Sequence, residues 1–340
     1  MAAYTAIDDP EAYFQVELYT GTGSALTATF DGDTDMQPDL IWIKERSASD
    51  SAHNLTDSVR GAGKAVFPSS TQVEYDYGTG SDGTVLTFAS DGFTLGTATQ
   101  VNANTVTFVA WCWKESATAG FDIVAYTGTG NDATATISHS LSAVPDFIWI
   151  KCRTSSKNNI TYHGSLGNTY SQYLDETNAS STSYDYWADT SPTSSVFTVK
   201  DDGSYDEVNA ANDQTFIAYL WSGKQGFSKF GSYTGNGADS GPFVFLGFRP
   251  AFLILKRADS ADAWTIFDNK RDTDNPVLQK LEAHASTAEA AGDPGHDFLS
   301  NGFNLRETGG HVNTSGGTYV YMAFAEAPFV NSNGVPCNAR

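Results

Sequence analysis

Two acidic turns hold the side chains best suited to bind a cation, because carboxylate oxygens are the ligands that Ca²⁺ prefers. The carboxylates are those of Asp31, Asp33 and Asp35 in the first turn, and of Asp201, Asp202, Asp206 and Glu207 in the second. An EF-hand loop needs Gly at its sixth position and Glu at its twelfth, where this chain has Met36 and Trp42. We therefore interpret both turns as solvated and predict no metal site, with a loosely bound cation as the alternative.

No other residue pattern predicts a catalytic centre or a cofactor site. Residues 78–83 match G-x-G-x-x-G, but a strand pattern follows where a dinucleotide site needs a helix, so we interpret them as a turn. Ser165 lies beside His163 without the G-x-S-x-G context of a nucleophile. A glycosidase site needs two carboxylates that are close in space, and the sequence does not give that distance, so this alternative stays open. The histidines show no metal-ligand spacing; they are His53, His139, His163, His284, His296 and His311.

The composition is that of an acidic protein with folded cores. Of its 340 residues, 40% are hydrophobic and 17% charged, and 40 acidic against 19 basic residues give a net charge of −21. Such a field repels nucleic acid and anionic membranes, so neither is an expected partner. Residues 1–9 show no signal peptide, and no stretch is long enough for a transmembrane helix. The cysteines are too few for a disulfide framework and indicate a reducing cytoplasm; they are Cys112, Cys152 and Cys337.

A threefold internal repeat determines the predicted architecture. The motif Tyr-Thr-Gly-x-Gly begins at Tyr19, Tyr126 and Tyr233, at a constant spacing of 107 residues. Each copy continues with an apolar run that starts at a proline and ends at a lysine; these runs are 38–44, 145–151 and 250–256. An asparagine then precedes a closing apolar strand in each copy: Asn102, Asn209 and Asn313. The glycines indicate tight turns, and the nearly continuous apolar runs predict strands covered on both faces.

We predict an all-β fold of three tandem β-sandwich domains, with the jelly roll as a variant. The predicted domains are residues 15–117, 118–225 and 226–330, between an N-terminal segment 1–14 and a C-terminal tail 331–340. Turns at 91–92 and 301–302 are expected to open strands, and residues 196–199 to form the matching strand of the middle copy. Only residues 277–291 look helical. Linkers 115–120 and 222–226 are short, so the domains should lie close together.

The positions shared by the copies are of fold-forming types, so we expect contacts with partners at the unshared loops near residues 45–85, 152–190 and 257–297. Four aromatic residues within or beside these loops suggest carbohydrate binding, with packing in the core as the alternative. They are Tyr162, Tyr184, Tyr186 and Trp187.

The repeats resemble a family of structural proteins of marine bacteriophages that are often labelled tail-fibre-like. The resemblance rests on residues 19–23 with 38–44, on 57–61, on 109–114, on 192–198, and most closely on 226–237, 268–271 and 321–326. It implies a virion component, and it implies no activity and no catalytic residues. With the reducing cytoplasm indicated by the cysteines, we expect a virion protein that is made in the host cytoplasm.

We therefore expect a non-enzymatic virion protein exposed on the particle, with no cofactor. A tail fibre or tail appendage that contacts the host surface is the first expectation. A capsid decoration protein whose three domains imitate a trimer is the alternative, motivated by the equal repeat spacing and short linkers. A carbohydrate-binding or depolymerase module is a third. The expected partners are other virion proteins, a host surface polysaccharide or receptor, and further copies of this chain.

Overall fold

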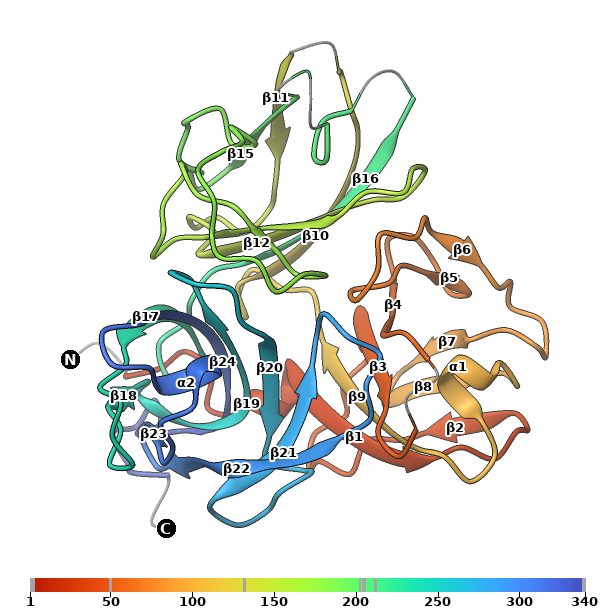
Figure 1. Ribbon diagram of the computed structural model, residues 1–340. Helices are drawn as coiled ribbons and strands as arrows, with labels where there is room; N and C mark the ends of the chain where they lie inside the picture. The colour runs from red at the N-terminus through yellow and green to blue at the C-terminus, as the bar shows by residue number, and fades with distance from the viewer. Residues whose placement is uncertain are drawn as a thin grey trace.

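The computed structural model describes residues 4–48, 51–130, 133–201, 203, 206–210 and 213–337. Strands predominate, and they form three lobes around a common centre (Figure 1). The predicted all-β fold is confirmed. We call the lobes unit 1 (β1–β9), unit 2 (β10–β16) and unit 3 (β17–β24).

Unit 1 is a sandwich of a four-stranded sheet, β1-β9-β3-β4, and a three-stranded sheet, β2-β8-β7, with a small hairpin β5-β6 at its side. A 3-10 helix, Pro10–Ala12, precedes it. Its elements are β1 (Phe14–Thr20), β2 (Leu26–Ala28), β3 (Leu40–Glu45), β4 (Asn54–Asp57), β5 (Lys64–Ala65), β6 (Tyr75–Asp76), β7 (Val85–Ala89), β8 (Gly92–Leu95), α1 (Thr99–Asn102) and β9 (Thr107–Trp113).

Unit 2 repeats the larger sheet as β10-β16-β12-β13-β14 and reduces the second sheet to β11-β15. Its strands are β10 (Phe121–Thr127), β11 (Thr134–Ser138), β12 (Phe147–Cys152), β13 (Asn159–His163), β14 (Gln172–Tyr173), β15 (Val196–Lys200) and β16 (Thr215–Trp221). The turns and strands predicted at 91–92, 196–199 and 301–302 lie at β8, β15 and β23, as expected.

Unit 3 joins both sheets into one eight-stranded sheet, β17-β24-β19-β20-β21-β22-β23-β18, because β21 and β22 bridge the gap between them. Its elements are β17 (Ser228–Thr234), β18 (Phe243–Phe245), β19 (Phe248–Arg257), β20 (Trp264–Asp268), β21 (Val277–Glu282), β22 (Ala290–Leu299), β23 (Gly302–Leu305), α2 (Gly310–Asn313) and β24 (Thr318–Pro328).

The prediction of a helix over residues 277–291 is wrong, because this segment contains β21 and the start of β22. β21 pairs with β20 through Thr265 and Ile266, and its Val277 and Leu281 are buried in two different cores. Helix propensity is a weak preference, and strand pairing with burial on both faces overrides it here.

Four hydrophobic cores hold the molecule together: one inside each unit and a central core shared by all three. The strand β3 shows how the sequence produces this arrangement. Its Ile41 and Ile43 face the core of unit 1, while Leu40 and Trp42 face the central core. β12 and β19 alternate in the same way. The predicted burial of these strands on both faces is therefore confirmed. One face is covered by the strand's own unit, and the other is covered in the central core by the neighbouring units.

Aromatic rings from corresponding positions meet in the central core. Trp113, Trp221 and Phe324 pair with equivalent residues of β3, β12 and β19. The ring centroid of Trp113 lies 6.1 Å from that of Trp221 and 5.6 Å from that of Phe324, both edge-on. Burying a large side chain contributes about 1.5–3 kcal/mol, so these rings bind the units into one body.

The Tyr-Thr-Gly-x-Gly motif is scaffold, and unit 1 shows why. The Tyr19 hydroxyl donates to the Val101 carbonyl at 2.7 Å, and the Asn102 side chain accepts from the Thr22 amide at 2.8 Å. A Cβ on Gly21 would lie 2.1 Å from the Ala103 carbonyl oxygen, so only glycine fits there. Units 2 and 3 repeat these hydrogen bonds at Tyr126, Asn209, Tyr233 and Asn313.

Candidate functional site

The two acidic turns are engaged within the chain. Asp31 forms an ion pair with Lys270 of unit 3 at 2.5 Å, and the Asp33 amide donates to Glu11. In the second turn Asp206 pairs with Lys157, and Glu207 accepts from the Asn158 amide at 2.7 Å. Asp202 lies outside the described residues. Within the part of the chain that the structure describes, no group of three or more His, Cys, Asp or Glu side chains is arranged to hold a metal ion.

The remaining motifs also take structural roles. Residues 78–83 form the loop between β6 and β7, which confirms the turn interpretation. His163 is buried at the boundary between units 2 and 3: its Nε2 donates to the Tyr321 carbonyl at 3.1 Å, and its Nδ1 accepts from the Ser165 amide at 3.2 Å. Burial lowers the pKa of His163 to about 4, so the ring is neutral near pH 7.

Three boundaries between units close a ring, and we name them the 1–2, 2–3 and 1–3 contacts. At each, a loop of one unit meets the end of a strand in another through a main-chain hydrogen bond. The bonds are Glu74 N to Arg153 O at 2.9 Å, Ser180 N to Ala258 O at 2.9 Å, and Glu289 N to Arg46 O at 2.8 Å. Unit 1 therefore covers unit 2, unit 2 covers unit 3, and unit 3 covers unit 1.

A buried lysine crosses each contact, at the end of the apolar run of each repeat. Lys44, Lys151 and Lys256 are fully buried, and each Nζ donates to a backbone carbonyl of its own unit and to one of the neighbour. The carbonyls across the contacts are those of Ser286, Ser70 and Thr177, at 2.9, 3.1 and 2.9 Å. Burial lowers the pKa of each lysine to about 8.

The 1–2 contact contains a buried charged cluster. Arg60 donates to Asp57 at 2.5 Å, to Glu74 at 3.1 Å and to the Tyr219 hydroxyl of unit 2 at 3.2 Å. That hydroxyl donates to Asp57 at 2.7 Å. Arg153 of unit 2 binds Glu74 through two nitrogens at 2.9 and 3.0 Å.

The 1–3 contact repeats this cluster with equivalent residues. Arg271 donates to Asp268 at 2.5 Å and pairs with Glu289 at 3.0 Å. Glu289 also binds Arg46 of unit 1. Trp111 takes the place of the tyrosine, because its Nε1 donates to Asp268 at 3.0 Å and its ring lies 5.7 Å from the Arg271 guanidinium.

The 2–3 contact lacks these charges. The strand register aligns His163 with Asp57 and Asp268, and Leu166 follows three residues later in the position of the two arginines. The main-chain bond aligns Ser180 with Glu74 and Glu289, and Ala258 with the two outer arginines. The Ser180 hydroxyl also donates to the Ala258 carbonyl at 2.6 Å. One of three equivalent boundaries is thus uncharged at all four positions.

A pocket of about 480 Å³ opens where Ser180 replaces a glutamate. It lies in unit 2, mostly within the region 152–190 predicted to contact partners, and Glu207 comes from the segment between β15 and β16. Its volume is in the range of small-molecule sites. The side chains that could recognise a ligand are those of Asn158, Tyr173, Glu176, Asn178, Tyr184 and Glu207, together with Ser181 and Ser183 on the rim. We call this the unit 2 pocket.

Hydrogen bonds fix the acidic side of the unit 2 pocket. The Asn158 side chain donates to Glu176 at 3.0 Å, and its amide N–H donates to Glu207 at 2.7 Å. Asn178 donates to the other oxygen of Glu176. Asp175 lies beside them and accepts from the Asn159 amide at 3.0 Å. Burial raises the pKa values of Asp175 and Glu207, and this rise exceeds the opposing effects of their hydrogen bonds and of the nearby Lys151 and Lys157.

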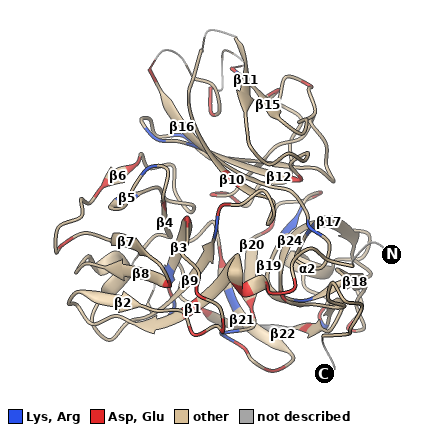
Figure 2. Cartoon of the chain, turned by 180° about the vertical axis from the view of Figure 1, so that it is seen from behind, with Lys and Arg blue, Asp and Glu red and all other residues tan. Residues whose placement is uncertain are grey.

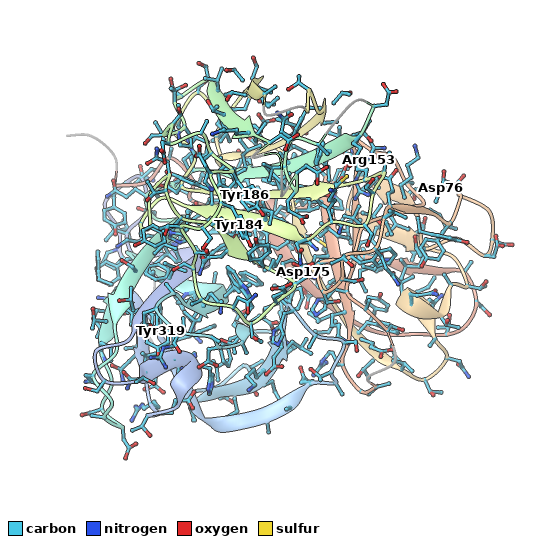
Figure 3. The ribbon with its side chains drawn as sticks, turned by 45° about the horizontal axis from the view of Figure 1, so that its top comes forward. Asp76, Arg153, Asp175, Tyr184, Tyr186 and Tyr319 are labelled. Carbon is cyan, nitrogen blue, oxygen red and sulfur yellow. The ribbon has the colours of Figure 1, made fainter. Side chains whose placement is uncertain are left out.

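Of the four aromatic residues considered for carbohydrate binding, three belong to the core of unit 2. Tyr162, Tyr186 and Trp187 are buried. Tyr184 alone lines the pocket, half-buried, with its ring centroid 5.5 Å from that of Tyr186 (Figure 3). The sequence pointed to Glu207 only as part of the second acidic turn and gave no signal for Glu176. The two are 31 residues apart, and only the fold brings both to Asn158.

The fold and these contacts define a class: an all-β protein of three repeated sandwiches closed into a ring. The chain belongs to the family described as domain of unknown function DUF7483, whose model matches residues 9–328. One family model therefore spans all three units. No curated protein matches the chain. Within the described residues, no helix has the length and apolar character needed to cross a membrane.

Proposed function

We propose that the chain is a non-enzymatic structural protein of a bacteriophage particle, and that it acts as a single-chain mimic of a trimer on the capsid surface. The cyclic order of the three contacts carries this proposal. Each unit covers the next in one sense around the ring, which is how the subunits of a closed cyclic trimer associate. A chain of this shape fits over a threefold position of a lattice of identical subunits.

Two further observations support a surface role. Acidic residues are spread over all three lobes (Figure 2), and a strong net charge keeps an exposed protein soluble. The sequence resemblance to phage structural proteins supplies the context of a particle. A tail appendage is the second candidate, because that resemblance carries a tail-fibre-like label.

Labelled antibody against the chain, imaged on intact particles, tests the placement. We expect label spaced regularly over the head. Label confined to the tail would replace the capsid placement by the tail placement, and particles without label would overturn the virion role. Incubating the purified chain with host envelope polysaccharide tests the absence of catalysis, since release of reducing sugar would identify a depolymerase.

A further inference from the structure

The unit 2 pocket coincides with the place where the internal symmetry fails. At the 1–2 and 1–3 contacts, Glu74 and Glu289 each reach an arginine of the neighbouring unit. At the 2–3 contact the same positions are Ser180 and Ala258, whose side chains are much shorter. Ser180, the shorter replacement on the unit 2 side, lines the pocket together with other residues of unit 2.

The pocket combines an aromatic ring with fixed hydrogen-bond acceptors. The Tyr184 ring lines one part, and it is supported by Tyr186, whose hydroxyl lies 3.0 Å from that of Tyr173. Glu176 and Glu207 present carboxylates whose orientation is set by Asn158. A polyhydroxylated ring matches this pairing, because its C–H face packs on an aromatic ring while its hydroxyl groups donate to the carboxylates.

The charge of the pocket limits the ligand further. Two lysines interact with the acidic groups beside the pocket. Lys157 is paired with Asp206, and the Nζ of Lys151 donates to the carbonyls of Ser70 and Lys157. Glu176 is bound by two amide groups, and no ion pair of it occurs among the described residues. Carboxylates in this setting favour donors that are neutral or positively charged and repel anions.

We propose that the unit 2 pocket binds a saccharide built of neutral or amine-bearing sugar residues, with one ring on Tyr184 and its hydroxyl or amino groups on Glu176 and Glu207. This binding is independent of where the chain sits on a particle. It would let a particle that carries the chain adhere to a glycan surface.

Isothermal titration of the full chain with three tetrasaccharides tests the proposal. The probes are N-acetylated chitotetraose, which is neutral, its deacetylated form, which is cationic at pH 6, and an alginate tetramer, which is anionic. We expect the neutral and cationic probes to bind, and the anionic probe to bind at least tenfold more weakly. Binding of none of them, or tightest binding of alginate, would overturn the proposal.

Variants locate the site. Tyr184→Ala and Ser183→Arg should each weaken binding at least tenfold, the first by removing the ring and the second by filling the pocket from an exposed position. Glu176→Gln should weaken binding of the cationic probe more than binding of the neutral probe. Tyr75→Ala is the matched control, because Tyr75 is an exposed tyrosine of unit 1. Folding of every variant is checked by its melting temperature. Wild-type affinity in a folded Ser183→Arg variant, or equal loss in Tyr75→Ala, would exclude this pocket.

Discussion

At the 1–2 contact, Arg60 lies between two carboxylates and a tyrosine hydroxyl, whereas at the 2–3 contact the equivalent position is Leu166. Both contacts keep the same main-chain hydrogen bond between units and the same buried lysine. The main chain, the lysines and the central core therefore set the geometry of the ring. The charged cluster can be exchanged for an uncharged set at one contact, in line with the finding that buried ion pairs are weak evidence for stability.

The largest expected effect comes from removing one member of a charged cluster. Asp57→Ala leaves Arg60 buried without its closest partner, which we expect to lower the free energy of unfolding by about 3–5 kcal/mol. Guanidinium unfolding followed by tryptophan fluorescence measures it. His163→Ala, at the equivalent position of the uncharged contact, is the comparison and should cost less.

Placing uncharged residues of the 2–3 contact in the 1–2 contact tests the same comparison between the two contacts. The substitutions Asp57→His, Arg60→Leu and Tyr219→Met give three inner positions of the 1–2 contact the residues of the 2–3 contact, where Met322 is the equivalent of Tyr219. Glu74 keeps its ion pair with Arg153. We expect this triple variant to be more stable than Asp57→Ala, because it leaves no unpaired charge. A triple variant less stable than the single one would show that the charged cluster is required.

The 2–3 contact should weaken in acid. The pKa of His163 is lowered to about 4 by burial, against about 6.5 in an unfolded chain. Between these values the unfolded state binds the proton first, so stability falls as pH drops from 6.5 to 4, by up to about 3 kcal/mol. His163→Gln should remove this share of the decline. His53 and His296 have lowered pKa values as well, so some decline remains in the variant.

The three lysines should act in the opposite pH range. A folded-state pKa of about 8 lies below the ordinary value of 10.5, so the unfolded state binds more protons above pH 8. Each lysine then contributes a rise in unfolding free energy between pH 8 and 9.5, of about 1–2 kcal/mol. Lys44→Met should reduce the slope by about a third. An unchanged slope would mean that Lys44 keeps an ordinary pKa.

The smallest effect is expected at the outer arginines. Arg153 is partly exposed and pairs with Glu74 at the rim of the 1–2 contact. Its equivalent at the 2–3 contact is Ala258, so Arg153→Ala should cost only about 0.2–1 kcal/mol in denaturant unfolding. A loss near that of Asp57→Ala would contradict the idea that only the inner pair is critical.

The repeats made the strands and turns predictable, because glycines such as Gly21 and alternating apolar residues such as Ile41 act locally. Two features were not predictable. The segment that contains Val277 and Leu281 was predicted to be helical, because most residues of the two cores that these side chains enter are distant from it in sequence. The unit 2 pocket depends on Glu176 and Glu207 meeting at Asn158, and no local pattern encodes that meeting.

Segments near the two ends of the described chain meet where a third linker would be. Asp8 accepts from the Ser332 amide at 2.6 Å, and the Tyr4 hydroxyl donates to the Gly247 carbonyl at 3.0 Å. At this boundary units 1 and 3 touch without a linker between them. The ring should therefore tolerate a different order of the units along the chain. A circular permutant opened between residues 115 and 120, with the present ends joined, should fold to the same ring.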